Sequence, residues 1–415
     1  MKKFYVESYG CTMNQGEGKF LFKELTNLGY TPCRSAEEAD LVVLNTCTVV
    51  ETTELRMLRR LSELRSQGKE MVLTGCMAKV QNEVLSASSP ASLIIPPQEY
   101  DQFSEKISQR YGGSPKKVYI PSETTAILPI SQGCMGSCTY CITRFARGSL
   151  HSFPEEQLLA EFQTMISSGV KEVLLTSQDI ASYGKDRGSD ICSLLELLLE
   201  EEGNFRIRLG MMNPEHAIPL KERLLDLMRD RRLYRFLHIP VQSGSDRILS
   251  HMGRRYSVAD FVSFVEEVHR QYPEMSIATD MIVGFPGENE EDHILSLNLL
   301  EKIRPDIINI TRFSPRPGTA AATMPDRPHG RISKARSREM AALHMRLGKM
   351  NNNLLVGNVE EVMVTEHGRG DTMISRTDSY KPVVIPAGPF LGQRLKVRLT
   401  AATPTHLFGE PVDSA

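Results

Sequence analysis

The sequence predicts an α/β protein built from three parts, and three stretches of differing pattern indicate them. Short apolar runs alternate with helix-length amphipathic segments from Phe4 to about Tyr111, and the alternation returns from Ala126 to about Phe313. Such alternation is typical of parallel sheets with helices on their faces. Beyond Asn358 the chain changes to short strand-like pieces broken by Gly, Pro, Asp and Ser, which is typical of a small antiparallel barrel.

The first part has three candidate strands with amphipathic helical segments between them. The strands are FYVESYG, LVVLNT and MVLTG, and the helical segments are FLFKELTNLGY and LRMLRRLSELRSQG. Apolar runs of this kind predict a small parallel sheet. The following stretch, GGSPKKVYIPSETT, is rich in Gly, Pro, Ser and Thr and predicts a linker. We therefore expect a domain at 1–112, a linker at 113–125, a second domain at 126–349 and a third at 350–415.

The second part has six candidate strands with helices between them. The strands are AILPI, KEVLLTS, FRIRLGM, FLHIPVQ, SIATDMIVG and IINITRF. Six strands fall short of the usual eight, so we expect an open, partial (βα)6 barrel. Ser152, Ser257 and Asn289 each stand before a helical pattern, and we expect them to cap those helices.

The second part ends in a basic segment, and the third part is rich in strand-like pieces. RISKARSREMAALHMRLGK, from Arg331 to Lys349, predicts a basic helix because Glu339 is its only acid. The strand-like pieces that follow are VEEVMVTEH, DTMISRT, KPVVIP, RLKVRLTAAT and HLFGEPV.

Composition restricts the class of protein without revealing its partners. The 415 residues carry 49 Lys+Arg against 51 Asp+Glu, so any contact with a polyanion must come from a local basic patch. The N-terminal stretch is too polar for a signal peptide or a membrane span, and we expect a cytoplasmic protein with no membrane contact. Eight cysteines in a reducing compartment are improbable disulfides. Those with regular placement are candidates for metal or redox chemistry.

Three cysteines share one loop directly after the candidate strand AILPI. Cys134, Cys138 and Cys141 have the spacing C-x3-C-x2-C. Such a loop can wrap an iron–sulfur cubane, with three irons each taking a thiolate and the fourth left open. Two alternatives stand beside this interpretation: a zinc site completed by a distant His, and three unrelated buried thiols.

Three further cysteines each follow a different strand of the first part. Cys11 follows FYVESYG, Cys47 follows LVVLNT and Cys76 follows MVLTG. Carboxyl ends of parallel strands meet at one edge, so these thiols can converge on a second cluster. The alternative is that they pack as ordinary buried cysteines. Cys33 and Cys192 lack this placement, and we expect both to be structural.

The central motif, with an aromatic residue before its last cysteine, resembles that of the radical S-adenosylmethionine superfamily. The resemblance implies that the open iron binds S-adenosylmethionine and that Tyr140 flanks its adenine. One electron from the cluster then cleaves the cofactor to a 5′-deoxyadenosyl radical.

The whole chain resembles the methylthiotransferase family, through SYGCTMN, LNTCTV, LTGCMA and the central motif. The resemblance implies a flavodoxin-like first domain, a radical-SAM barrel, a TRAM-like third domain and two [4Fe–4S] clusters. YCITRFARGSLHSFP, with Arg144 where bacterial subclasses usually have Pro, is most similar to the archaeal and eukaryotic subclass acting on N6-threonylcarbamoyladenosine-37 of tRNA. A second S-adenosylmethionine as methyl donor and an external electron donor, such as a flavodoxin or ferredoxin, are also implied.

Family roles can be placed on several strand-end residues. Ser177, Gln178 and Asp179 match the motif for the cofactor's amino group, and Arg208, Asn213 and Gln242 are candidates for its carboxylate or ribose. The first three can instead cap the next turn, and Arg208 can pair with a structural acid. Residues 284–287, GFPG, allow close approach of a nucleoside or form an ordinary turn. We expect His238 to be a satisfied core residue.

Basic side chains supply the candidates for tRNA contact, namely Arg144, Arg147, the run from Arg331 to Lys349, and Arg394, Lys396 and Arg398. Their alternative is a solvated surface. We expect a radical enzyme that methylthiolates C2 of N6-threonylcarbamoyladenosine-37. The alternatives are another modified adenosine or a protein residue as the target, and a non-catalytic, zinc-stabilised RNA-binding protein.

Overall fold

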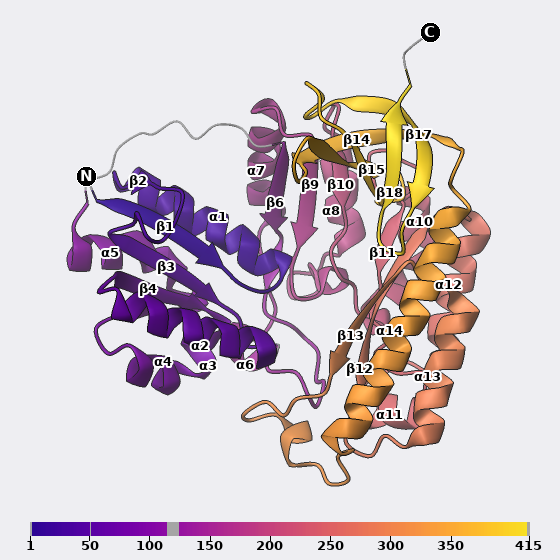
Figure 1. Cartoon of the computed structure of the whole chain (residues 1–415), viewed down its shortest axis with the longest axis horizontal. Coiled ribbons are helices and arrows are strands. Elements are labelled where there is room, and N and C mark those ends of the chain that lie inside the picture. Colours follow the sequence, from indigo (N-terminus) through magenta and orange to yellow (C-terminus); the bar gives the residue numbers. More distant parts are fainter. Residues whose placement is uncertain (1, 50, 114–123, 413–415) are drawn as a thin grey trace.

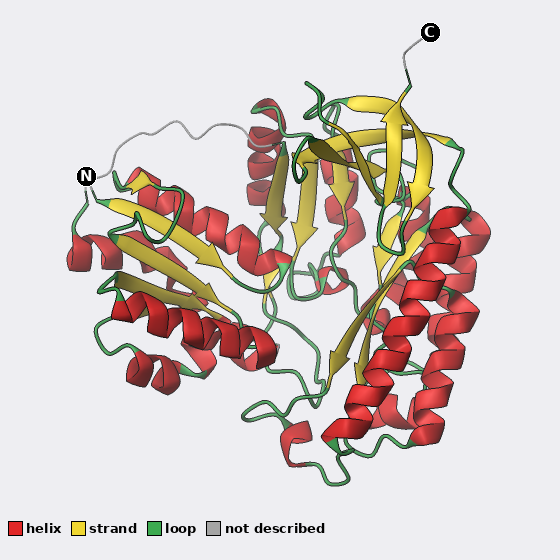
Figure 2. Cartoon of the chain, in the orientation of Figure 1, coloured by secondary structure: helices red, strands yellow, loops and turns green. Residues whose placement is uncertain are grey.

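The computed structural model describes residues 2–49, 51–113 and 124–412 and shows three parts in the expected order (Figures 1 and 2). Most of the predicted linker lies outside the described residues. Its last residue, Thr125, already begins strand β6 (Thr125–Pro129).

The first part is a parallel sheet of five strands in the order β2-β1-β3-β4-β5. This order is flavodoxin-like, as expected. The strands are β1 (Lys3–Ser8), β2 (Thr31–Pro32), β3 (Leu41–Thr46), β4 (Glu70–Gly75) and β5 (Leu93–Ile95). The helices are α1 (Thr12–Asn27), α2 (Glu51–Ser66), α3 (Cys76–Val80), α4 (Asn82–Ser88) and α5 (Phe103–Tyr111).

Strand β3 is buried throughout because the sheet has an apolar core on each face. Val42 and Leu44 join one core, while Leu41 and Val43 join the other. The register pairs Ser8 with Asn45 and Thr46 with Gly75, so β1, β3 and β4 end at one common edge.

The second part contains all six expected strands. They form two three-stranded parallel sheets, β10-β9-β6 and β11-β12-β13, which isolated bridges such as Met211–His238 connect. The strands after β6 are β9 (Glu172–Thr176), β10 (Arg206–Arg208), β11 (Phe236–His238), β12 (Ser276–Val283) and β13 (Ile307–Arg312). The hairpin β7 (Ser131–Gln132) and β8 (His151–Ser152) lies beside them.

Helices cover the outside of this partial barrel (Figure 2). The long ones are α7 (Glu155–Ser167), α8 (Ile191–Leu199), α12 (Val258–Gln271), α13 (Glu290–Ile303) and α14 (Gly330–Asn353). The short ones are α9 (Pro214–Ala217), α10 (Lys221–Leu227) and α11 (Asp246–His251). The short helix α6 (Thr143–Arg147) instead packs against α3 of the first part.

Two of the three expected helix caps are confirmed. Ser257 and Asn289 form capping boxes at α12 and α13. The prediction for Ser152 was wrong, because Pro154 occupies the N-cap of α7. Ser152 instead belongs to the β7–β8 hairpin, where its hydroxyl accepts a hydrogen bond from Gly184 N–H at 2.9 Å.

The third part is a closed five-stranded barrel in the order β14-β15-β16-β18-β17. Its strands are β14 (Val359–His367), β15 (Thr372–Thr377), β16 (Pro382–Pro386), β17 (Arg394–Ala402) and β18 (Leu407–Pro411). The barrel differs from the expected antiparallel one in the β16–β18 pair, which is parallel.

The small barrel docks on the amino-terminal ends of the central strands (Figure 1). Asp378 accepts a hydrogen bond from Arg206 of β10, and the Tyr380 ring lies 4.8 Å from that of Tyr234. The cysteine loop lies at the opposite end of the central strands, where their carboxyl ends are not covered by the small barrel. Among the helices that the structure describes, none combines the length and apolar character needed to cross a bilayer.

Candidate active site

The central triplet lies on the loop between β7 and α6. Burial raises the pKa of Cys134 to about 12, and the nearby thiols of Cys141 and Cys138 act in the same direction. Cys141 also acts to raise the pKa of Cys138. At Gly136 a Cβ atom would stand 3.2 Å from the Cys134 sulfur and 3.7 Å from the Cys138 sulfur. A side chain there would enter the space between two thiols, so glycine keeps that space open.

Gln178 fixes the start of this loop. Its Oε1 accepts a hydrogen bond of 2.7 Å from the Gly133 N–H. Gly133 has φ +82°, and a Cβ there would collide with the Ser149 carbonyl, so only glycine suits the turn. Gln178 therefore positions the cysteine loop from the end of β9.

The second triplet lies at the shared edge of the N-terminal sheet. Cys11 stands at the N-cap of α1, Cys47 directly follows β3, and Cys76 begins α3. The sulfurs of Cys11 and Cys76 lie 4.0 and 3.9 Å from one atom, Asn14 Oδ1. Burial raises the pKa of Cys76 to about 12, the nearby charge of Arg147 acts to lower it, and Cys47 and Cys11 act to raise it. The structure thus brings together the three thiols that the sequence assigned to one site.

The donor set fits iron–sulfur clusters. In the described part of the chain, no group of three His, Cys, Asp or Glu side chains could hold a single metal ion. An iron–sulfur cluster does not need three ligands around one metal ion, because each thiolate binds a different iron. All eight cysteines are described and none is in a disulfide. Thiolates are the soft ligands that such clusters use, and the two triplets supply six.

The residues that close β9 already have partners within the protein. Ser177 Oγ accepts a hydrogen bond of 3.1 Å from the Asp179 N–H. The buried Asp179 carboxylate accepts from the backbone N–H groups of Ala181 and Asn213, and lies 2.6 Å from His216 Nδ1. These contacts match the alternative given for Asp179 from the sequence, in which it caps the next turn. A cofactor role for these residues stays a prediction.

Arg254 connects two other candidates and was not identified from the sequence. It donates to the Tyr140 hydroxyl and, at 3.1 Å, to Asn213 Oδ1. Its charge also acts to lower the pKa of Cys138, although burial raises that pKa overall. Arg254 therefore ties Asn213 to Tyr140 of the cysteine loop.

Arg208 lies in a different environment. Its guanidinium stands 5.1 Å from the Phe236 ring and 5.7 Å from the ring of Tyr380 in the small barrel. It packs where the two domains meet and not beside Tyr140. We therefore withdraw Arg208 as a cofactor ligand.

A cavity of about 700 Å³ opens beside the central triplet. Tyr140, Cys141 and Gln242 line it on the barrel side, and Val49 and Thr52 line it from the N-terminal domain. Gln242 has φ +73°, a strained value for a residue with a side chain.

His238 lies near this cavity and behaves as expected of a satisfied residue. Its Nε2 lies 2.7 Å from Asp280, which also lines the cavity. Although burial acts to raise it, the hydrogen bonds from His238 and Asn309 hold the pKa of the Asp280 carboxyl below its ordinary value.

Comparisons with known proteins decide the family. Family models match residues 3–96 (uncharacterized protein family UPF0004), 128–300 (radical SAM superfamily) and 353–412 (TRAM domain). The chain is 36% identical to a Pyrococcus horikoshii protein named "Probable threonylcarbamoyladenosine tRNA methylthiotransferase", over 99% of both chains. It is 32% identical to the "Threonylcarbamoyladenosine tRNA methylthiotransferase" of Danio rerio, over 100% of this chain and 79% of that one.

This chain belongs to the threonylcarbamoyladenosine tRNA methylthiotransferase family. Its membership of the radical SAM superfamily implies S-adenosylmethionine and a [4Fe–4S] cluster. A solved structure with a similar fold is the radical S-adenosylmethionine methyltransferase TsrM from Kitasatospora setae. The TM-score is 0.54 at 13% identity, over 77% of this chain and 76% of that one.

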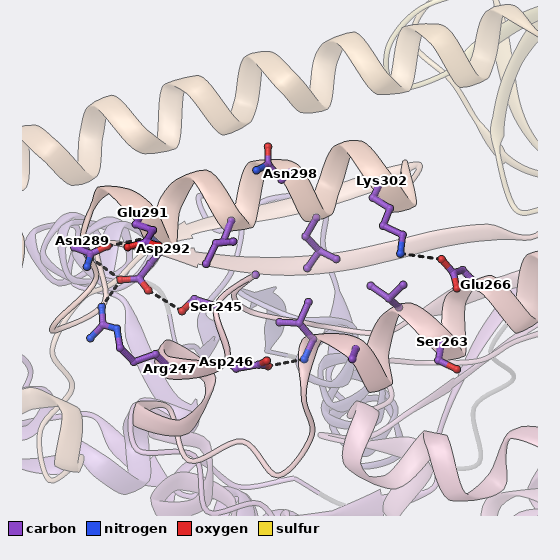
Figure 3. A pocket seen from close by; sticks show the side chains of 16 residues that line it. Ser245, Asp246, Arg247, Ser263, Glu266, Asn289, Glu291, Asp292, Asn298 and Lys302 are labelled. Carbon is purple, nitrogen blue, oxygen red and sulfur yellow. Dashed lines mark hydrogen bonds and ion pairs between the residues drawn. The ribbon is translucent and has the colours of Figure 1, made fainter.

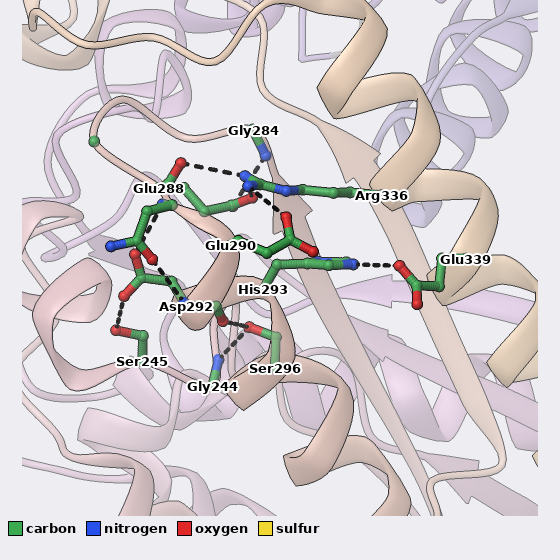
Figure 4. Close-up of polar contacts among 12 residues, drawn as sticks. Gly244, Ser245, Gly284, Glu288, Glu290, Asp292, His293, Ser296, Arg336 and Glu339 are labelled. Atoms are coloured by element: carbon green, nitrogen blue, oxygen red, sulfur yellow. Dashed lines mark hydrogen bonds and ion pairs between the residues drawn. The ribbon is translucent and has the colours of Figure 1, made fainter.

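The structure corrects two of the tRNA candidates in this methylthiotransferase. Arg147 is buried between the first two domains, where it pairs with Glu17. Arg336 is buried against Glu288 at 2.7 Å and also pairs with Glu290 (Figure 4). Neither side chain is exposed at the surface, whereas that of Arg144 is.

The network around Arg336 also explains the GFPG turn. The Gly284 N–H donates to Glu288 Oε2 at 3.0 Å, and its φ is +74°. A Cβ at Gly284 would collide with Ser333 of α14. The glycine is thus needed for packing against α14 in an ordinary turn.

A larger cavity of about 830 Å³ contains none of the predicted site residues. It lies between α12 and α13, where Lys302 pairs with Glu266 at 3.0 Å and Asp292 accepts from Ser245 (Figure 3). The chemistry assigned to the thiols therefore points to the smaller cavity.

The two cysteines outside the triplets have structural surroundings. The Cys33 thiol donates to the Phe4 carbonyl at 3.1 Å, and Cys192 is fully buried in the core of the barrel. Burial raises the pKa of both.

Proposed function

We propose that this protein converts N6-threonylcarbamoyladenosine at position 37 of tRNA into its 2-methylthio derivative. The single observation that carries the proposal is the cavity beside Cys141. Its walls come from the cysteine loop of the barrel and from Val49 and Thr52, which closely follow Cys47 in the N-terminal domain. One space thereby adjoins elements of both thiol triplets.

Cys134, Cys138 and Cys141 would hold the cluster that binds S-adenosylmethionine. When bound, that cluster supplies the electron that cleaves the cofactor to a carbon radical. The protein's own residues prepare the site. Gln178 holds the start of the loop through the Gly133 N–H, and Arg254 holds Tyr140 within the loop.

Cys11, Cys47 and Cys76 would hold a second [4Fe–4S] cluster that provides sulfur. Asn14 orders this triplet, because its amide donates to the carbonyls of Tyr9 and Thr46, each at 2.8 Å, while Oδ1 faces two of the sulfurs. Hydrogen bonds that surround metal ligands in this way fix the geometry of those ligands.

Positive side chains line the same cavity and suit a nucleic-acid substrate. They are Arg312, Arg316, Arg327 and Arg338. Arg316 is buried and donates to Glu54 at 2.6 Å, while its Nε and Nη2 have no partner among the described residues. Lys396 and Arg398, exposed on one face of β17, are further positive side chains on the small barrel.

The reaction also requires partners outside this chain. Reduction needs an external electron donor such as a flavodoxin or ferredoxin, and a second S-adenosylmethionine would donate the methyl group. With tRNA as substrate, we place the activity in the cytoplasm. We propose functional units at 1–112, 126–349 and 350–415.

Nucleoside analysis of tRNA from a strain lacking the protein tests this function. We expect loss of 2-methylthio-N6-threonylcarbamoyladenosine and accumulation of its unthiolated precursor. The full chain should restore the product, and a C134A/C138A/C141A variant should not. Unchanged 2-methylthio-N6-threonylcarbamoyladenosine in the deletion strain would contradict the proposal.

A further inference from the structure

Arg147 is a buried cation placed between the two thiol triplets. It ends α6, which begins two residues after Cys141, and its side chain reaches the N-terminal domain with only 1% of its surface exposed. Burying a guanidinium is unfavourable unless it is paired and hydrogen-bonded. The hydrogen-bond partners of Arg147 therefore show which groups its buried charge acts on.

All the partners of Arg147 belong to the second triplet and its surroundings. Nε donates to the Cys76 sulfur at 3.2 Å, and Nη2 donates to Asn14 Oδ1 at 2.7 Å and Glu17 Oε2 at 2.9 Å. Nη1 donates to the other oxygen of Glu17. Asn14 Oδ1 in turn faces the sulfurs of Cys11 and Cys76.

The same short helix is attached to the N-terminal domain at a second point. Gln98 Nε2 donates to the Ala146 carbonyl at 2.6 Å. Since α6 follows Cys141 almost directly, these bonds connect the central cysteine loop to the second triplet. The connection consists of hydrogen bonds that hold α6 against the N-terminal domain and of the positive charge that Arg147 places beside Cys76.

We propose that Arg147 is a positioning residue that raises the reduction potential of the cluster held by Cys11, Cys47 and Cys76. This inference rests on the second cluster of the proposed function. A reduced cluster carries one more negative charge, and a cationic hydrogen bond to a ligand sulfur stabilises that charge. Glu17, as the counter-ion of Arg147, opposes the effect.

The two charges therefore predict shifts of opposite sign. Replacing Arg147 by Met removes the positive charge and the bond to Cys76, so the potential becomes more negative. Replacing Glu17 by Gln leaves Arg147 unbalanced, so the potential becomes more positive. A purely structural role would not give opposite signs.

The test is an EPR-monitored redox titration of the full chain with C134A/C138A/C141A, which leaves only the second triplet to hold a cluster. We expect R147M to lower the reduced-to-oxidised ratio at a fixed potential by about tenfold, equivalent to about 59 mV for one electron. E17Q should raise it. R144M is the matched control, because Arg144 lies on α6 but is exposed, and it should leave the ratio unchanged.

The outcomes separate this inference from the function on which it rests. If the parent binds no cluster, the proposed second cluster is wrong. If the parent binds the cluster but R147M and E17Q leave the potential unchanged or move it in the same direction, the role of Arg147 is overturned. If R147M loses its cluster, R147K, which keeps the charge without Nε, provides the comparison with E17Q.

Discussion

Gly10 offers a direct test of whether Cys47 is held in place for a cluster. It has φ +97°, and a Cβ there would stand 2.7 Å from the Cys47 sulfur. G10A should cost about 1–2 kcal/mol for the left-handed backbone. To reach 3.4 Å, where ordinary contact begins, the sulfur must also move by more than the ~0.5 Å that functional sites tolerate.

We therefore expect G10A to bind about four irons per chain after anaerobic reconstitution, against about eight for the unchanged protein. Iron and acid-labile sulfide counts measure this. Gly68 provides the control, because its φ is +70° and nothing lies within 4 Å of its Cβ position. G68A should suffer a similar backbone penalty and keep about eight irons. Full iron content in G10A, or equal iron depletion in both variants, would refute the reasoning.

Three further predictions concern stability, RNA binding and thiol reactivity. R336M should lower the free energy of unfolding, measured with denaturant, by about 3–5 kcal/mol because it leaves Glu288 buried without its cationic partner. R338M, at an exposed position of the same helix, should change it by less than about 0.5 kcal/mol. Equal effects of the two variants would contradict the network. K396A/R398A should weaken tRNA binding. The slope of the logarithm of the binding constant against the logarithm of salt concentration should fall by about one for each phosphate that is no longer neutralised, and an unchanged slope would exclude these residues as phosphate ligands. Burial raises the pKa of Cys192 to about 12, so iodoacetamide should not label it at pH 8 in the folded protein but should label it in urea; mass spectrometry showing rapid labelling of the folded form would contradict this.

Pattern alone predicted strands β1, β3 and β4 and the placement of the thiols, because parallel strands deliver their carboxyl ends to one edge. It did not predict the short edge strands β2 and β5 of the same sheet. Cys11, Cys47 and Cys76 are far apart in the chain, yet each follows an apolar run that registers with its neighbour. The parallel β16–β18 pair could not be predicted in this way, since short strands do not reveal their order in a closed barrel.

The arginines were harder to place, because burial depends on partners far away in sequence. Arg147 pairs with Glu17 across 130 positions, and no local signal marks that contact. Arg336 did carry a signal. It lies at helical spacing from the buried Met340, Leu343 and Leu347, on the same stripe of α14. Its charge led us to place it on the surface.

Anaerobic reaction of the reconstituted protein with tRNA containing N6-threonylcarbamoyladenosine, followed by mass spectrometry of the nucleosides, tests the central claim most directly. With S-adenosylmethionine and a reductant present, we expect 2-methylthio-N6-threonylcarbamoyladenosine together with 5′-deoxyadenosine. We expect no methylthio product from the C11A/C47A/C76A variant. Formation of 5′-deoxyadenosine by the intact protein with no 2-methylthio product, or a methylthio group on a different nucleoside, would contradict the claim.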